Sequence, residues 1–306
     1  MSRRVIIDTD PGLDDAVAIL LALADPALDV IGITSVAGNI GIALTTRNAG
    51  RLLAAMGCGD VPVAIGAIGP LQGRTIDEAA IHGDDGLGGV KLPEPDHPPK
   101  PDAVLWLAET LRAHPAGSID LLALGPLTNL ALLLRQDPDA ARRLGRVIAM
   151  GGAIDEPGNV GTRSEFNCAA DPHAVAEVLA AGLDLTLVPL DVTRKVRANR
   201  QDVAELMAGS TVAAQLSGAF VAAYFQTAIL KESRPLHDPL VMLLAVAPEL
   251  FALEPMWLTV ERDDPIEAGA LSRDPEGQPV LVAMGIDAPS AMARLKAGLG
   301  GAAGRP

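Results

Sequence analysis

The chain has 306 residues, of which 49% are hydrophobic and 20% charged, and its formal net charge is −14. This profile predicts a single globular domain over residues 1–306, and the negative charge argues against a nucleic-acid partner, which usually needs basic side chains against the phosphates. We expect no membrane span or export signal, because no apolar run reaches about 20 residues. Two cysteines, Cys58 and Cys168, are too few for a disulfide framework and lack zinc-site spacing, which favours a reducing, cytoplasmic location.

Short β-branched runs alternate with longer stretches rich in alanine and leucine, a pattern typical of strand-helix units around a parallel sheet. Strands are predicted at 5–8, 30–36, 61–65, 119–124, 147–150 and 185–190. Helices are predicted at 15–24, 44–56, 103–113, 128–135, 172–180, 201–208 and 238–246. The proline-rich segment 92–102 predicts a surface connection, and short strands at 267–271 and 279–286 precede a last helix. The expected fold class is α/β, with a Rossmann-like, mostly parallel central sheet flanked by helices and a small antiparallel addition near the C-terminus.

Polar residues and glycines directly follow several of the predicted strands. The carboxyl ends of parallel strands meet at one edge of a sheet, where ligands bind, so these residues are expected to share one rim. The segments concerned are 8–15, 37–39, 125–129, 151–152 and 191–193.

The segment 8–15, DTDPGLDD, places four carboxylates within eight residues. Like charges this close repel unless protons or a cation neutralise them, and oxygen ligands without cysteine or histidine favour calcium or magnesium over zinc. Pro11 and Gly12 allow a tight turn that brings Asp10 over the start of a helix, beside Asp14 and Asp15. A purely helix-capping role for Asp14 and Asp15 is the alternative.

Two further groups of residues are candidates for binding or catalysis. Asn159, Glu165 and Asn167 lie in a glycine-containing segment, and their amides and carboxylate suit sugar hydroxyls, although a solvated turn explains them equally well. His237 and Asp238 open an apolar helix, where they could act as a general acid and a metal ligand, or only as a surface histidine beside a capping aspartate. The loop histidine His82 is similarly ambiguous.

Taken together and in order, these segments resemble the inosine-uridine preferring nucleoside hydrolase family, whose N-terminal signature is DxDPGxDDAxAI. The signature is complete here as DTDPGLDDAVAI at 8–19. The resemblance continues through VAGN at 36–39, IHG at 81–83, GPLTNLA at 125–131, MGG at 150–152, EFN at 165–167, DP at 171–172 and HDP at 237–239. These motifs extend over about three-quarters of the chain.

The resemblance implies calcium-dependent hydrolysis of the N-glycosidic bond of ribonucleosides to ribose and free base, by a homodimer or homotetramer. Asp10 would act as base toward a metal-bound water, and His237 would protonate or bind the leaving base. The implied calcium ligands are Asp10, Asp15, Asp238 and the carbonyl of Leu124, which replaces the threonine of some members. The implied substrate contacts are Asp14, Asn39, Met150, Asn159, Glu165 and Asn167 toward ribose, His82 toward the base, and Phe166. One of Tyr224 and Phe225 is also implied to contact the base, and the resemblance leaves open which of the two.

Two other functions are compatible with parts of this pattern. A strand ending in DxD also occurs in magnesium-dependent phosphohydrolases of the haloacid dehalogenase type, but the asparagines here suit neutral hydroxyls better than phosphate. A nucleoside-binding protein without turnover is the second alternative, although an intact Asp10 and a full ligand set argue against it. The sequence leaves the preference between purine and pyrimidine bases open, since aromatic residues make up only 2% of the chain.

Overall fold

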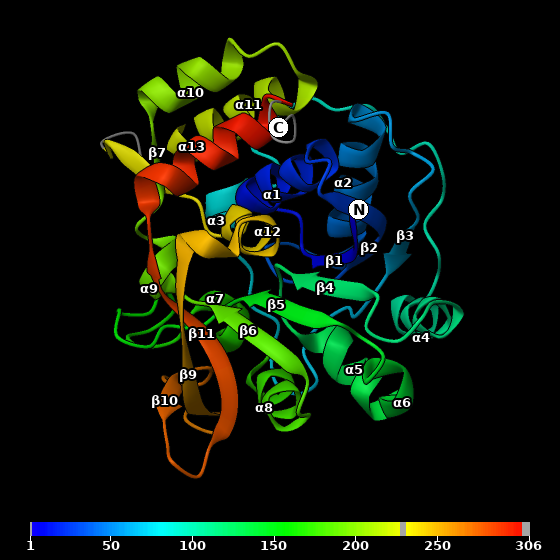
Figure 1. Ribbon diagram of the computed structural model, residues 1–306, viewed down its shortest axis with the longest axis vertical. Coiled ribbons are helices and arrows are strands. Elements are labelled where there is room, and N and C mark those ends of the chain that lie inside the picture. The colour runs from blue at the N-terminus through cyan, green and yellow to red at the C-terminus, as the bar shows by residue number, and fades with distance from the viewer. Residues whose placement is uncertain (1, 227–230, 302–306) are drawn as a thin grey trace.

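A nine-stranded sheet runs through the middle of the protein, and helices cover both of its faces (Figure 1). The structure is a computed structural model and describes residues 2–226 and 231–301. The strand order is β10-β9-β11-β6-β5-β4-β1-β2-β3. The strands are β1 (Arg3–Thr9), β2 (Leu28–Ser35), β3 (Val63–Ile65), β4 (Ile119–Ala123), β5 (Arg146–Met150), β6 (Asp184–Val188), β9 (Phe251–Val260), β10 (Leu271–Arg273) and β11 (Gln278–Ile286).

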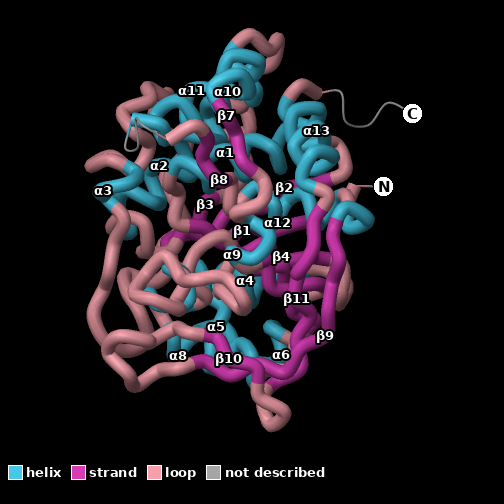
Figure 2. Tube along the Cα trace, turned by 90° about the vertical axis from the view of Figure 1, so that its left-hand side faces the viewer, coloured by secondary structure: helices cyan, strands magenta, loops and turns pink. Residues whose placement is uncertain are grey.

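The neighbouring pairs among β1 to β6 are all parallel, and β11 joins them as a parallel neighbour of β6. The pairs β11 with β9 and β9 with β10 are antiparallel, and these strands extend down one side of the molecule (Figure 2). The α/β fold class, with its mostly parallel sheet and antiparallel addition, is therefore confirmed.

Alternation along the strands divides the apolar side chains between two cores, because successive residues of a strand face opposite sides of the sheet. Val5 and Ile7 of β1 belong to one core, and Ile6 belongs to the other. The first core is covered by α1 (Leu13–Ala24), α2 (Ile42–Ala55), α10 (Arg200–Met207), α11 (Val212–Gln226), α12 (Pro239–Val246) and α13 (Ala288–Leu299). The second is covered by α4 (Ala103–Ala113), α5 (Thr128–Gln136), α6 (Pro138–Ala141) and α8 (Pro172–Ala180).

Several elements differ from the sequence prediction. Strand β9 was not predicted, because Pro255 and a run of exposed side chains remove the alternation that marks a strand. Helix α11 was not predicted either, since it is apolar on most of its surface. The expected strand at 267–271 is wrong over 267–270, which form a turn before β10. The remaining short elements are α3 (Ala79–His82), α7 (Phe166–Ala170), α9 (Leu190–Thr193), β7 (Arg197–Asn199), β8 (Ser233–Pro235) and a 3-10 helix at Pro248–Leu250.

Among the helices of the described residues, none has the length and apolar character required to cross a bilayer.

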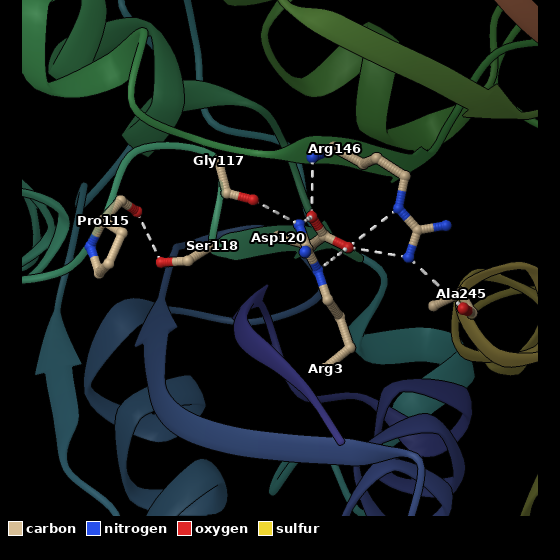
Figure 3. A network of polar contacts seen from close by, with 7 residues as sticks. All are labelled: Arg3, Pro115, Gly117, Ser118, Asp120, Arg146 and Ala245. Atoms are coloured by element: carbon tan, nitrogen blue, oxygen red, sulfur yellow. Dashed lines mark hydrogen bonds and ion pairs between the residues drawn. The ribbon is translucent and has the colours of Figure 1, made fainter. Parts of the chain in front are cut away.

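Asp120 ties three segments together at the amino ends of the strands (Figure 3). Its carboxylate is fully buried and accepts hydrogen bonds from the guanidinium groups of Arg3 and Arg146, with Nε of each at 2.9 Å, and from the backbone N–H of Arg146 at 2.8 Å. Arg3 also donates to the carbonyl of Gly117 at 2.8 Å. Burial alone would raise the pKa of Asp120, but the hydrogen bonds from Arg3 and Arg146 outweigh it and hold the pKa below its ordinary value.

Replacing Asp120 with alanine is expected to lower the free energy of unfolding by about 2 kcal/mol, because two partly buried guanidinium groups lose their anion. Since the folded-state pKa is depressed, the contribution of Asp120 is present above its unfolded pKa and is lost as pH falls through the folded pKa. Urea unfolding at neutral and acidic pH measures both effects. Asp139→Ala, which removes an exposed pairing with Arg142, is the control and should change stability by less than about 0.5 kcal/mol.

Candidate active site

The turn between β1 and α1 places acidic side chains at the carboxyl edge of the sheet. Asp15 accepts hydrogen bonds from the backbone N–H of Gly12 at 3.0 Å, the hydroxyl of Thr9 at 2.6 Å and the amide of Asn39 at 3.0 Å. Asp15 therefore caps α1. It also belongs to a set of neighbouring carboxylates, here called the acidic group, which consists of Asp10, Asp14, Asp15 and Asp238. Asp8 does not join them, because its carboxylate bonds to Thr34 and Asn129 inside the sheet.

Three carboxylates converge in a geometry that could hold a metal ion. Asp14, Asp15 and Asp238 each offer an oxygen within 4.8 Å of the others, and all three residues are buried. Asp238 stands at the N-cap of α12, but its side chain makes no capping hydrogen bond. Burial, and then repulsion by Asp14, Asp15 and Asp10, raises the pKa of Asp238 well above its ordinary value. Simple capping therefore does not account for Asp238.

Asp10 lies beside this group with one oxygen uncommitted. Its Oδ2 accepts the backbone N–H of Asn39 at 2.7 Å, whereas its Oδ1 is buried and has no hydrogen-bond partner within residues 2–226 and 231–301. A Cβ added at Gly38 would stand 2.0 Å from Oδ2, and one added at Gly125 would stand 2.5 Å from Oδ1, so glycine is needed at both positions. Burial, followed by repulsion from Asp15, raises the pKa of Asp10 well above its ordinary value. A buried oxygen of this kind needs a proton, a cation or a ligand.

A cavity of about 100 Å³ opens beside the acidic group. Its wall contains most of the residues predicted from the sequence, drawn from eight separate parts of the chain. The lining residues are Asp14, Asn39, Glu78, Ile81, His82, Leu124, Met150, Asn159, Glu165, Phe166, Asn167, Tyr224, His237 and Asp238. Glu78 and Ile81 were not predicted, because they lie in an irregular segment without a hydrophobic period.

One part of this wall is built from amides, a carboxylate and carbonyl oxygens. The amide of Asn167 donates to the carbonyls of Leu124 at 2.6 Å and Met150 at 3.2 Å. Glu165 caps α7 and accepts three backbone N–H groups, from Asn167 at 2.9 Å and from Gly152 and Cys168 at 3.1 Å. Burial raises the pKa of Glu165 despite these hydrogen bonds. Fixed acceptors and donors of this kind suit the hydroxyl groups of a sugar.

Rings gather at another part of the wall. His82 and Tyr224 stack with ring centroids 6.5 Å apart and an interplanar angle of 19°, and the guanidinium of Arg234 lies 3.6 Å from the centroid of Tyr224. Of the two adjacent aromatic residues predicted to contact a base, Tyr224 lines the cavity, whereas Phe225 lies under the guanidinium of Arg200 at 4.8 Å. Helix α11 therefore presents only one of the pair to the cavity among the lining residues described.

Both cavity histidines are uncharged at neutral pH. Burial, aided by Arg194, Arg197 and Arg234, lowers the pKa of His237 to about 3. Burial lowers the pKa of His82 to about 4, although Asp15 opposes the shift. The Nδ1 of His82 accepts the backbone N–H of Leu13 at 3.0 Å, so a neutral His82 carries its proton on Nε2.

The short helix α9 braces both parts of the wall. Asp191 accepts the backbone N–H groups of Ile154 at 2.8 Å and Asp155 at 2.7 Å, in the segment that leads to Asn159. Thr193, two residues further on, has its hydroxyl 2.7 Å from Nδ1 of His237. The polar residues predicted on the rim at 191–193 thus support the cavity wall without lining the cavity.

Comparison with known proteins identifies clear relatives. Residues 5–293 match the family model described as inosine-uridine preferring nucleoside hydrolase. The pyrimidine-specific ribonucleoside hydrolase RihA of Citrobacter koseri is 41% identical over 266 residues, 85% of each chain. An uncharacterised protein of Schizosaccharomyces pombe is 35% identical over 274 residues, 87% of each chain.

Solved structures agree with this grouping. The plant nucleoside hydrolase PpNRh1 superposes with a TM-score of 0.90 at 33% identity, covering 98% of this chain and 99% of its own. A purine-preferring ribonucleoside hydrolase from Gardnerella vaginalis superposes with a TM-score of 0.89 at 28% identity and the same coverage.

The acidic group predicts a stability that depends on pH and on divalent cations. Burial, followed by repulsion from Asp15, raises the pKa of Asp14 to about 7. The folded state then binds more protons than the unfolded state, so the stability conferred by protonation is complete below the unfolded pKa of about 4 and is lost as pH rises through about 7. In chelator, the melting temperature should fall between about pH 5 and pH 8, whereas millimolar calcium should remove most of the fall by replacing the protons.

Differential scanning fluorimetry with and without calcium measures this difference, and Asp14→Asn should flatten the curve recorded in chelator. An equally steep fall in both conditions would place the titrating group elsewhere, for example at Asp8, whose pKa burial raises to about 6.

Proposed function

The chain belongs to the inosine-uridine preferring nucleoside hydrolase family and is a ribonucleoside N-glycosyl hydrolase, and we propose that it uses calcium and Asp10 to cleave the bond between ribose and base. The observation that carries this proposal is the unpartnered, buried Oδ1 of Asp10 beside three carboxylates that lie within 4.8 Å of one another. A base and a cation site in contact are what metal-assisted hydrolysis requires.

We propose that Asp10, Asp15, Asp238 and the carbonyl of Leu124 would hold the calcium ion, and that Asp14 would bind the ribose hydroxyls. All the donors are oxygens, the set that hard cations such as calcium prefer. Asp14 and Asp238 line the cavity, and Asp10 and Asp15 lie beneath it, so the donors belong to one cavity floor. When bound, the ion would polarise the attacking water and neutralise the carboxylates, whose pKa values burial otherwise raises.

The remaining polar wall fits the ribose. Asn39, Asn159, Glu165 and Asn167 offer donors and acceptors for hydroxyl groups, and Met150 and Phe166 supply apolar contact. The carboxylate of Glu165 is fixed by three backbone N–H groups, so it presents negative charge without moving. Fixed carboxylates near the ring would stabilise the positive charge that develops on the sugar as the glycosidic bond breaks.

In the reaction, a water oxygen bonds to the anomeric carbon while the bond from that carbon to the base nitrogen breaks. Asp10 accepts the proton of the water, since its free oxygen is the one without a partner. The bonding electrons leave with the base, which therefore needs a proton or a hydrogen bond. We place His237 as that donor, with Thr193 orienting its ring and with His82 and Tyr224 against the base.

The other functions allowed by the sequence have less support. A phosphohydrolase of the haloacid dehalogenase type does not account for a family match over residues 5–293. A binding protein without turnover would retain the cavity but release no ribose. We also propose cytoplasmic location and assembly into a homodimer or homotetramer, as in the family. The names of the relatives include both pyrimidine-specific and purine-preferring enzymes, so both base classes belong in the first assay.

Asp10→Asn is expected to lower kcat by about 10³-fold, because the amide cannot accept the proton of the water while keeping nearly the same shape. Free ribose is measured with inosine, uridine, cytidine and adenosine, in calcium and after chelation. Asp29→Asn, an exposed carboxylate on β2, is the control and should retain full activity. Equal ribose release by wild type and Asp10→Asn would show that Asp10 is not the base.

His237→Ala should lower kcat by about 10²-fold with inosine or uridine, since the leaving base loses its hydrogen-bond donor. With a riboside whose leaving group is already a stable anion, such as 4-nitrophenyl riboside, the loss should be less than about threefold. His114→Ala, distant from the cavity wall, is the matched control. Equal losses with both substrates would mean that His237 acts on binding or folding and not on the leaving group.

A further inference from the structure

Glu78 places a carboxylate in the cavity wall without a hydrogen-bond or ion-pair partner among the residues that the structure describes. Its side chain is half-buried and lines the same cavity as His82 and Tyr224. Within residues 2–226 and 231–301 it makes no side-chain hydrogen bond or ion pair, and it does not cap the helix that follows it. Burial, and then the neighbouring Asp77, raises the pKa of Glu78. A carboxylate kept partly out of water without a donor is suited to receive one from a ligand.

The backbone around Glu78 holds this side chain near the rings. Glu78 directly precedes α3, and its carbonyl accepts the N–H groups of Ile81 at 2.8 Å and His82 at 3.0 Å. Glu78 and His82 both line the cavity, so their side chains face the same space. Its own N–H donates to the carbonyl of Asn39 at 3.0 Å. The backbone of Glu78 is therefore held on both its N–H and its carbonyl side, and its side chain lines the same cavity as His82 and Tyr224.

We propose that Glu78 selects the nucleobase by accepting a hydrogen bond from an exocyclic amino group, which favours cytidine over uridine and adenosine over inosine. Each of these pairs differs at one ring edge, where an amino group with a neighbouring acceptor nitrogen replaces a keto oxygen with a neighbouring N–H. A carboxylate only accepts hydrogen bonds, so an amino group is bound and a keto oxygen at the same position is repelled. The inference rests on the proposed function, since it assigns the base to this end of the cavity.

The test compares Glu78→Gln with wild type on the two matched nucleoside pairs. Glutamine keeps the size of the side chain, but its amide offers a donor to a keto oxygen as well as an acceptor. The ratio of kcat/KM for cytidine over uridine, and for adenosine over inosine, is expected to fall at least about tenfold in Glu78→Gln. Asp77→Asn removes the same charge one residue away, from an exposed side chain, and should leave both ratios within about twofold of wild type.

Unchanged ratios in Glu78→Gln would overturn the inference, and so would an equal loss with all four nucleosides, which would place Glu78 on the sugar or in the fold. The dissociation constants of the same nucleosides, measured by calorimetry on calcium-loaded protein, separate this inference from the proposed function. A binding ratio that depends on Glu78 in a protein releasing no ribose would support base selection and refute hydrolysis. Ribose release with ratios that stay the same in Glu78→Gln would support hydrolysis and refute base selection.

Discussion

The structure depends on keeping several carboxylates together in a buried place. Asp10, Asp14 and Asp238 repel one another and lose hydration at the carboxyl edge of the sheet, and their pKa values rise accordingly. The protein offsets part of this cost with fixed donors, which include the N–H of Asn39 toward Asp10 and the N–H of Gly12 toward Asp15. The rest is left for protons or a cation, so the unfavourable charge that the fold retains is the same charge that a metal-assisted hydrolase needs.

The two parts of the cavity wall are constrained to different degrees. The part proposed for the sugar is anchored to the sheet, because Asn167 bonds to the carbonyls of Leu124 and Met150 at the ends of β4 and β5. The part proposed for the base comes from α3 and α11, which are helices outside the sheet. Chemistry at the ribose is common to every nucleoside, whereas bases differ. A sugar site anchored to the sheet beside a base site carried on helices is a division that suits a family whose members differ in base preference.

The sequence predicted the features that depend on residues close together in the chain. The turn at Pro11 and Gly12, the acidic residues around it and the parallel strands follow from composition and alternation within short windows, and all of them appear in the structure. The sequence did not show which side chains of distant segments face the cavity. Helix α11 is apolar nearly all around, so no period distinguished Tyr224 from Phe225. Glu78 was missed because its exposure to the cavity depends on its tie to Asn39, far away in the chain. Its position four residues before His82 of the IHG motif was the signal that could have identified it.

The acidic group joins the first turn of the chain to α12, which packs against α1 near the other end. A ribosome must therefore synthesise more than three-quarters of the protein before Asp238 emerges to complete it. Until then, the acidic turn after β1 lacks Asp238. Bringing Asp238 to this turn closes a loop of more than 200 residues, which costs conformational entropy. Completion of the acidic group is thus a late event in biosynthesis, after synthesis of β1 to β6 and before that of β9, β10 and β11.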